Sequence, residues 1–368
     1  MTPQLQPSAW SLLPSEWKPL CKELGLPSFR ADQIVNGLYQ NFAPSWQDIT
    51  TLPADARAAL SARFDLAPLQ TAHVHDAPDG VKKLLLACAD GEHIETVLIP
   101  SKGRLTQCIS TQVGCALGCV FCASGANGRV RDLTSGEIVA QVMAACQLMR
   151  AAAPAADQPP PPKPGPKPQL PRPGNIVVMG MGEPFANYDN VLRALRILND
   201  QKGLNIGARH ITISTCGLVP GIRRLAEEGL QFELSVSLHA PNDALRDRIM
   251  PVNKTWPIAV LLDTCRAYTE KTGRIVTFEY TLVRNLNDRS QHADELIRLL
   301  RHTPCKVNLI PLSPVENFDG ERPDDRTCLA FLDALLKAKI NTTLRKSRGK
   351  DVSAACGQLR LRKLSRPS

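Results

Sequence analysis

The sequence predicts an α/β fold, a partial (β/α)6 barrel of the TIM type, preceded by a small helical N-terminal domain that ends in a β-hairpin. Three observations carry this prediction. Strand-like runs alternate regularly with helix-like runs from residue 106 onward. The residues before position 100 show a different pattern, of short helices and then strands. Finally, the motifs that carry chemistry follow the strands, where barrels of this type place their active sites.

Residues 1–100 are expected to form the accessory domain. Residues 29–39 place apolar side chains at helical spacing, which predicts a helix. Two strand-like runs, 81–88 and 93–99, flank a turn at 89–92 and predict a β-hairpin. The domain is therefore helical at its start and ends in a two-stranded unit.

Residues 101–350 are expected to form the barrel. The first helix opens with the capping box Thr134-Ser-Gly-Glu137. Each strand–helix unit with a right-handed crossover adds one parallel strand, and six such units describe a barrel short of the full eight. The expected strands are 106–111, 175–179, 210–214, 232–238, 274–283 and 306–311, and the expected helices are 134–150, 188–199, 220–228, 259–272, 292–301 and 328–339.

Two segments lie outside this regular pattern. The Pro-rich stretch 151–174 is expected to be an extended insertion between the first helix and the second strand. It should leave the barrel on the face opposite the active site, because it follows a helix. Residues 351–368 are expected to form a C-terminal tail.

The composition excludes several classes of protein. No apolar run approaches a membrane span, and residues 1–13 lack the basic start and apolar stretch of a secretory signal. We therefore expect a cytoplasmic protein with no membrane partner. The formal net charge of +9 suits a polyanionic partner. Twelve cysteines in a reducing compartment argue against a disulfide framework, so their spacing must reveal their use.

Three closely spaced cysteines follow the first predicted barrel strand. Cys115, Cys119 and Cys122 form a C-x₃-C-x₂-C motif whose thiolates can bind three corners of a [4Fe–4S] cluster and leave the fourth iron open. A zinc site would need a further ligand cluster at a fixed spacing, and none follows in the sequence. Phe121 would shield the cluster from solvent. The motif therefore predicts an iron–sulfur cluster with an open iron.

Polar groups follow the other predicted strands. The second strand runs into Gly180-Met-Gly-Glu-Pro184, where glycines let the backbone approach a ligand and Glu183 can accept hydrogen bonds from an ammonium group. The third ends in Ser214-Thr-Cys-Gly217, which offers hydroxyls. The fourth places Ser237 or His239 at the barrel mouth, and the sixth leads to Ser313. The sequence thus predicts one site at the carboxyl ends of the strands.

The motifs together resemble those of the RlmN/Cfr family of radical S-adenosylmethionine (radical-SAM) adenine methyltransferases, which act on large-subunit ribosomal RNA. The resemblance implies a radical-SAM barrel in which the open iron chelates the amino and carboxylate groups of S-adenosylmethionine. Their joint occurrence in one order over nearly the whole chain is far more specific than any single motif. The matching stretches are residues 29–33, 94–97, 108–115, 180–184, 237–242 and 355–359.

The resemblance implies a radical route with a covalent intermediate. Cys356 would be methylated by one S-adenosylmethionine, and a second would be cleaved to a deoxyadenosyl radical that takes a hydrogen from that methyl group. The methylene radical would add to an adenine ring carbon, which is too electron-poor for ordinary methyl transfer. Glu95 matches the family's general base, and Cys108 matches the thiol that attacks the Cys356 sulfur and frees the product, with a transient disulfide.

The resemblance also implies the cofactor contacts. Gly182 and Glu183 would lie at the methionine end of S-adenosylmethionine. The rest of the S-adenosylmethionine molecule would contact Ser214, Ser237, Leu238, His239 and Ser313. Ser313 stands where relatives usually carry Asn, and Leu84 stands where many carry Trp.

The expected reaction is methylation of carbon 2 of a specific adenine in 23S rRNA, and some members of the family also modify tRNA. The resemblance implies a monomer and an electron donor such as flavodoxin or ferredoxin. The basic stretch 345–350 would hold RNA phosphates.

Three alternatives stay open at this point. The first is Cfr-type methylation at carbon 8 of adenine, which shares all the motifs. The second is a radical-SAM enzyme with a small-molecule or peptide substrate, which would leave Cys108 and Cys356 unexplained. The third is a non-catalytic cysteine-rich RNA-binding or zinc protein, which would purify with zinc.

Overall fold

The computed structural model describes residues 6–101, 103–152, 171–315, 318–345 and 358–359 of the chain. A ten-stranded sheet runs through these residues in the order β1-β2-β3-β4-β7-β8-β9-β10-β11-β12. A separate ribbon pairs β5 (Gln112–Gly114) with β6 (Arg129–Asp132). The strands of the large sheet are β1 (Leu69–Asp76), β2 (Lys82–Cys88), β3 (His93–Ser101), β4 (Arg104–Cys108), β7 (Asn175–Val178), β8 (Ile211–Thr215), β9 (Glu233–Ser237), β10 (Val276–Leu282), β11 (Cys305–Pro311) and β12 (Asn341–Leu344).

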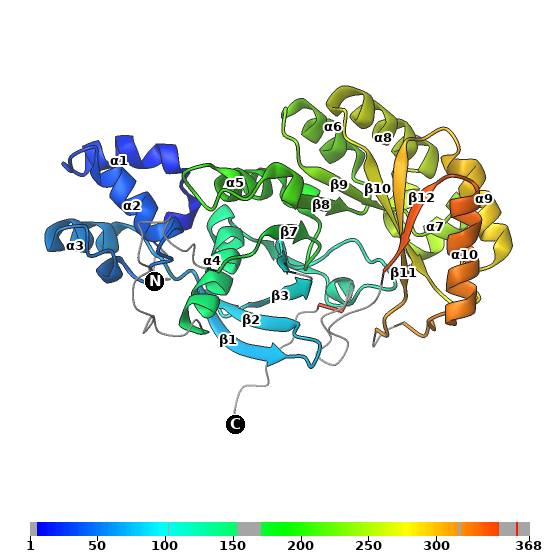
Figure 1. The fold of residues 1–368 in the computed structure, drawn as a ribbon, viewed down its shortest axis with the longest axis horizontal. Coiled ribbons are helices and arrows are strands. Elements are labelled where there is room, and N and C mark those ends of the chain that lie inside the picture. Colours follow the sequence, from blue (N-terminus) through cyan, green and yellow to red (C-terminus); the bar gives the residue numbers. More distant parts are fainter. Residues whose placement is uncertain (1–5, 102, 153–170, 316–317, 346–357, 360–368) are drawn as a thin grey trace, which may run out of the picture.

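The parallel part of the sheet confirms the predicted α/β barrel. The strands from β4 to β12 pair in parallel, each with the next in sheet order, and helices alternate with them along the chain. All six predicted barrel strands are present, and β12 adds a seventh. Figure 1 shows the helices on the outside of the curved sheet. The barrel helices are α4 (Ser135–Ala152), α5 (Tyr188–Asn199), α6 (Val219–Glu227), α7 (Asp243–Ile249), α8 (Ile258–Thr272), α9 (Ser290–Leu300) and α10 (Asp325–Lys337).

The N-terminal segment contains three short helices and then the predicted β-hairpin. The hairpin strands β2 and β3 are antiparallel, and they join the same sheet as the barrel because β3 also pairs with β4. A further strand, β1, lies at the free edge beside β2. The division of the chain into domains near residue 100 stays a prediction. The N-terminal helices are α1 (Trp17–Glu23), α2 (Arg30–Tyr39) and α3 (Ala54–Arg63).

The N-terminal helices share one apolar core with the barrel. Trp10, Trp17 and Tyr39 are almost completely buried, and they belong to the same cluster as the apolar side chains of α4 and α5. The side chain of Arg193 on α5 donates to the carbonyl of Ser11 and pairs with Glu16. Within the described residues, no helix combines the length and the apolar character needed to cross a bilayer.

The two faces of the parallel strands differ in chemistry. Side chains alternate between the faces along a strand. The outer face is apolar and packs under the helices, with Ile213, Val236 and Phe278 almost completely buried. The inner face carries the polar side chains Thr212, Ser214, Ser235, Ser237, Glu279 and Asn308, which share a face by strand register. From β8 to β11 the inner face of the barrel is therefore largely polar.

The predicted insertion and tail lie almost wholly outside the described residues. Of the Pro-rich stretch 151–174, residues 153–170 are not described. The flanking chain ends α4 at Ala152 and begins β7 at Asn175. Of the tail, residues 358–359 are described.

Candidate active site

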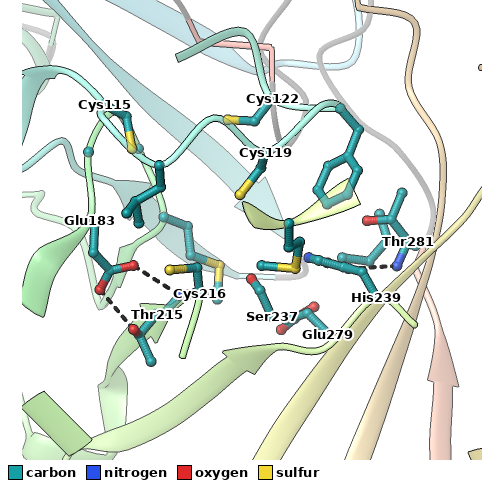
Figure 2. A pocket seen from close by; sticks show the side chains of 18 of the residues that line it. Cys115, Cys119, Cys122, Glu183, Thr215, Cys216, Ser237, His239, Glu279 and Thr281 are labelled. Carbon is teal, nitrogen blue, oxygen red and sulfur yellow. Dashed lines mark hydrogen bonds between the residues drawn. The ribbon is translucent and has the colours of Figure 1, made fainter. Parts of the chain in front are cut away.

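A pocket of about 970 Å³ opens at the carboxyl ends of the parallel strands, with part of its volume open to solvent. Its position is the one that the sequence predicts. Figure 2 shows the side chains that converge on it. The pocket is lined by Cys115, Leu117, Cys119, Phe121, Cys122, Val178, Met179, Gly180, Gly182, Glu183, Ser214, Thr215, Cys216, Ser237, His239, Met250, Glu279, Thr281, Ile310, Leu312, Ser313 and Arg345.

The loop that carries the three cysteines connects β5 to β6. Its two ends are joined by the amide of Cys115, which donates to the carbonyl of Gly128 (3.0 Å), and its middle is held by the amide of Val120, which donates to the carbonyl of Ile249 (3.1 Å). Gly118 has φ +64°, a left-handed conformation that favours glycine. The loop therefore presents all three cysteines to one pocket.

The cysteine thiols fit the predicted cluster by their chemistry and position. Burial raises the pKa of the Cys115 thiol to about 11 and raises that of Cys119 as well, so ligation to iron would release their protons. Phe121 and Val120 pack on the small apolar cluster around Met250 beside the loop. Within the described residues, no three His, Cys, Asp or Glu side chains are arranged to hold a single metal ion. The fit rests on three thiols at one pocket wall, the donor set of an iron–sulfur cluster with one open iron.

Glu183 lies at the other side of the pocket and is 4% exposed. Its Oε1 accepts from the amide of Phe185 (3.0 Å) and from the hydroxyl of Thr215 (2.8 Å), and its Oε2 accepts from the amide of Cys216 (2.9 Å). Burial raises the pKa of this carboxyl, and the three donors oppose that rise. These bonds fix the carboxylate at the pocket wall. Its Oε2 can accept a further hydrogen bond from the ammonium group of a ligand.

The backbone before Glu183 approaches the first residue of β5 very closely. Gly182 has φ +100°, and a Cβ at this position would lie 2.6 Å from the Cβ of Gln112. The amide of Glu183 donates to the side-chain oxygen of Gln112 (2.9 Å). A side chain at Gly182 would therefore push the Glu183 segment away from the cysteine loop.

His239 is held as a neutral ring. Its Nδ1 accepts a hydrogen bond from the amide of Thr281 (2.9 Å). The ring packs edge to face with that of Phe121, and the two ring centroids are 4.7 Å apart. Burial, together with the charge of Arg246, lowers the pKa of His239 to about 3. Because Nδ1 is an acceptor, Nε2 carries the ring proton and His239 can act as a hydrogen-bond donor.

The remaining predicted cofactor contacts divide into two groups. Ser214, Ser237 and Ser313 line the pocket, from the ends of β8 and β9 and from the loop after β11. Leu238 does not: its side chain is completely buried, and its amide donates to the carbonyl of Glu279 (3.0 Å). Leu238 therefore supports the Ser237–His239 turn through its backbone.

Arg246, on α7, is a structural feature of the site that sequence reasoning missed. It is completely buried, and its guanidinium donates to the carbonyls of Cys216 (2.8 Å), Ser237 (2.9 Å) and Leu238 (3.1 Å). It also donates to the side-chain oxygen of Asn253 (2.8 Å). One buried cation thus ties together the ends of β8 and β9, which form one wall of the pocket.

Glu95 and Cys108 lie on neighbouring strands, β3 and β4. Cys108 is opposite Val97, which is two residues from Glu95, so the side chains of Glu95 and Cys108 share the inner face of the sheet. Cys108 is also in register with Val177 of β7, and Met179, two residues further, lines the pocket. The inner face therefore runs without interruption from these two residues to the pocket that holds the three cysteines.

Glu95 forms a buried ion pair that the sequence did not reveal. Its Oε1 lies 2.9 Å from Nζ of Lys83 on β2, and both side chains are less than 5% exposed. The ion pair fixes the position of the Glu95 carboxylate on the inner face of the sheet. The signal in the sequence was the pair of lysines in a strand that is otherwise apolar.

Cys356 lies outside the described residues. The two described residues that follow it, Gln358 and Leu359, are anchored at the site. The side chain of Gln358 donates to the carbonyl of Pro314 (2.9 Å), the residue after Ser313. The carbonyl of Leu359 accepts from the hydroxyl of Ser124 (2.6 Å), which lies two residues after Cys122. The sequence that follows Cys356 therefore meets both the cysteine loop and the loop after β11.

Comparison with known proteins finds relatives over almost the whole chain. The chain is 45% identical over 354 residues to a probable dual-specificity RNA methyltransferase RlmN of Halalkalibacterium halodurans, covering 96% of this chain and 93% of the relative. It is 46% identical to the corresponding protein RlmN 3 of Opitutus terrae, covering 93% and 91%. A model of the radical SAM superfamily matches residues 169–300. The crystal structure of a radical SAM methyltransferase from Sphaerobacter thermophilus superimposes with a TM-score of 0.89 at 45% identity, covering 96% of this chain and 99% of that one.

Proposed function

The chain belongs to the RlmN family of radical-SAM RNA methyltransferases. From this premise we propose that it methylates carbon 2 of one adenine in 23S rRNA, and an adenine in tRNA as well, through a methyl group carried by Cys356. The observation that carries the proposal is the continuous inner face of the sheet. This face joins Glu95 and Cys108 to the pocket of Cys115, Cys119 and Cys122.

The three cysteines would hold a [4Fe–4S] cluster, and Glu183 would bind the ammonium group of S-adenosylmethionine. When bound, the reduced cluster supplies the electron that cleaves S-adenosylmethionine to methionine and a 5′-deoxyadenosyl radical. Two molecules of S-adenosylmethionine are consumed per turnover, one as methyl donor and one as radical source. The protein's part is to hold the cofactor between the cysteine loop and the ends of β7 to β11.

Three residues carry the covalent chemistry. The Cys356 sulfur receives the methyl group, and loss of one hydrogen lets that carbon bond to adenine. Glu95, which pairs with Lys83, would remove the ring proton from the radical adduct, and the unpaired electron would return to the oxidised cluster, so that a closed-shell thioether remains. The thiolate of Cys108 then attacks the Cys356 sulfur, which breaks the sulfur–carbon bond and leaves a disulfide. The released carbon takes up a proton and becomes the methyl group of the product.

The partners follow from the same proposal. Arg345, at the start of the basic stretch 345–350, lines the pocket and supplies positive charge where an RNA phosphate would approach. The target adenine must leave its stack to enter, so a loop or junction in the RNA suits the site. A monomer acting in the cytoplasm, with an electron donor such as flavodoxin or ferredoxin, completes the proposal.

Mass spectrometry of nucleosides tests the reaction and its position. The wild type and its Cys356→Ala variant would be expressed in a host that lacks its own enzyme, and rRNA and tRNA would be digested separately. We expect 2-methyladenosine in both pools with the wild type and a loss of at least about a hundredfold with Cys356→Ala, because the methyl carrier is removed. A Cys305→Ala variant, changed at a half-buried cysteine on β11 outside the pocket lining, should behave as the wild type.

Other outcomes of this experiment are equally informative. Appearance of 8-methyladenosine would assign the chain to the Cfr type of reaction. If neither methyladenosine appears in either RNA pool, although the purified protein carries its cluster, the proposed RNA reaction is wrong.

A further inference from the structure

The hairpin of β2 and β3 carries Glu95 beyond the end of the neighbouring barrel strand. The backbone pairing of β3 with β4 begins at Val97, opposite Cys108, so residues 93–96 extend past the last pair. After Cys108 the chain runs into the ribbon of β5 and β6, which bears the cysteine loop. The hydroxyl of Ser110, in this connection, donates to the carbonyl of Glu95 (2.6 Å). The position of Glu95 relative to the cysteine loop therefore depends on contacts between the hairpin and this ribbon.

Arg131 on β6 joins the ribbon to the turn of the hairpin. Its Nε donates to Oδ2 of Asp90 (2.5 Å), in the turn between β2 and β3. The two terminal nitrogens of the same guanidinium donate to the carboxylate of Glu137 (3.0 and 2.8 Å), in the first turn of α4. Arginine suits this position because its donors form a rigid planar fork. One cation thus links the ribbon, the hairpin and a barrel helix.

The next residue of β6 ties the ribbon to the opposite side of the pocket. Oδ1 of Asp132 accepts from the side-chain nitrogen of Gln112 (2.7 Å), which is 1% exposed. The side-chain oxygen of Gln112 accepts from the amide of Glu183 (2.9 Å). Arg131 and Asp132 are consecutive, so β6 connects the hairpin of Glu95 to the segment of Glu183.

The contact between Arg131 and Asp90 is an ionised pair. Burial opposes the charge of Asp90, but the hydrogen bond from Arg131 outweighs this effect and holds the pKa of the carboxyl below its usual value. The two side chains remain 28% and 37% exposed, so their pair should contribute little to the free energy of unfolding. Oδ1 of Asp90 also accepts from the amide of Glu92 (3.1 Å), a bond that asparagine can retain. Replacement of Asp90 by asparagine should therefore leave the fold intact.

The proposed reaction uses groups on both sides of this link. Cleavage of S-adenosylmethionine would take place between the cysteine loop and Glu183, whereas removal of the ring proton would need Glu95 on the hairpin. Reactions between held groups are sensitive to displacements of about 1 Å. A hairpin that shifts against the ribbon should leave the cleavage intact and lower the share of radicals that end in methylated RNA.

We propose that Arg131, through its pair with Asp90, positions the hairpin of Glu95 against the cysteine ribbon and thereby couples cleavage of S-adenosylmethionine to methylation of the RNA. This inference rests on the proposed function and adds a positioning residue to it. Within the described residues, the pocket lining includes neither Arg131 nor Asp90. Their effect on the reaction therefore passes through the hairpin.

The yield of methyladenosine per 5′-deoxyadenosine tests the coupling. Cluster-containing protein would be mixed anaerobically with S-adenosylmethionine, reductant and target RNA, and both products would be counted in the first turnover. The wild type should form close to one methyladenosine for each 5′-deoxyadenosine. We expect Asp90→Asn to form 5′-deoxyadenosine within about twofold of the wild-type rate, with a yield lower by about three- to tenfold. Asp90→Glu keeps the charge and should recover most of the yield.

Hydrogen–deuterium exchange tests the positioning without turnover. The cluster-containing protein would be examined in the absence of RNA and S-adenosylmethionine. The amides of residues 93–96 should exchange on the order of threefold faster in Asp90→Asn than in the wild type, because the end of the hairpin is held less firmly. The amides of β7, in the barrel, should exchange at the wild-type rate.

Asp76→Asn is the matched control. Asp76 lies on β1, beside the hairpin, and pairs with Lys82 of β2, and both side chains are exposed. The substitution removes the same charge from the same part of the sheet but leaves the contact between Asp90 and Arg131 in place. It should behave as the wild type in both measurements.

Each further result decides the question. If Asp90→Asn keeps the wild-type yield, or if its residues 93–96 exchange as slowly as those of the wild type, the inference is wrong. A fall in both products at a constant ratio would also contradict it, because the pair would then support the cluster site instead of the coupling. A wild type that cleaves S-adenosylmethionine but methylates neither RNA would overturn the proposed function itself.

Discussion

Replacement of Cys108 by alanine is expected to stop product release and to leave the protein covalently joined to its RNA. The proposed reaction ends when the Cys108 thiolate breaks the bond between the Cys356 sulfur and the product carbon. Alanine cannot attack, so turnover should fall by roughly a thousandfold or more, the scale on which loss of a nucleophile acts. The adduct should appear as a slowly migrating band on a denaturing gel that nuclease digestion removes.

The structure indicates that this variant will fold. Cys108 is 8% exposed, and its backbone contacts, which include the pairing with β3 and β7 and acceptance from the hydroxyl of Thr96 (2.7 Å), do not depend on the thiol. Cys88→Ala, at a buried cysteine on β2 of the same sheet, is the matched control and should turn over normally. A Cys108→Ala protein that releases methylated RNA at the wild-type rate would contradict the role of this thiol. So would an inactive variant that forms no adduct while its cluster is intact.

Replacement of Arg246 by methionine is expected to lower the free energy of unfolding by about 3–5 kcal/mol, because several buried hydrogen-bond acceptors lose their donor at once. The carbonyls of Cys216, Ser237 and Leu238 would remain buried without this partner. Methionine fills a similar volume, so the loss should come mainly from the missing hydrogen bonds. Urea unfolding followed by circular dichroism measures the change.

The control for this prediction lies on the same helix. Arg248 is two residues further along α7 and is exposed, so Arg248→Met should change the free energy of unfolding by less than about 0.5 kcal/mol. The loss of unfolding free energy in Arg246→Lys should lie between those of the two methionine variants, since one ammonium group cannot reach all the acceptors that the guanidinium reaches. Equal stability of the Arg246→Met and Arg248→Met proteins would show that the strand ends do not depend on this cation.

The barrel could be predicted because its signal is local and repeated. Each predicted helix of the barrel is followed by turn residues and a new apolar run, and the structure has a strand and a helix at all six places. The strand β12 was missed because its four residues include two threonines and an asparagine, and they come directly after α10. The strand β1 was missed because most of its side chains are exposed, so its hydrophobic pattern is weak.

The site was harder to predict because much of it depends on which side chains become buried. Arg246 looks like a surface charge in the sequence, and only the closure of α7 against the ends of β8 and β9 places it in the interior. Glu279 did leave a signal. The run 276–282 alternates polar and apolar residues at its start, which is the pattern of a strand with one polar face. That this face lines the pocket follows only from the curvature of the whole sheet.

The central claim, that the methyl carbon passes through Cys356 as a radical, is tested most directly with S-adenosylmethionine whose methyl group carries three deuterium atoms. The anaerobic protein, reductant and target RNA would be run for several turnovers, so that any unlabelled methyl group on the protein is diluted. The account predicts methyladenosine with two deuterium atoms and 5′-deoxyadenosine with one, since the radical removes a single deuterium from the carried methyl group. Methyladenosine that retains all three, with unlabelled 5′-deoxyadenosine, would mean direct methyl transfer and would contradict the account.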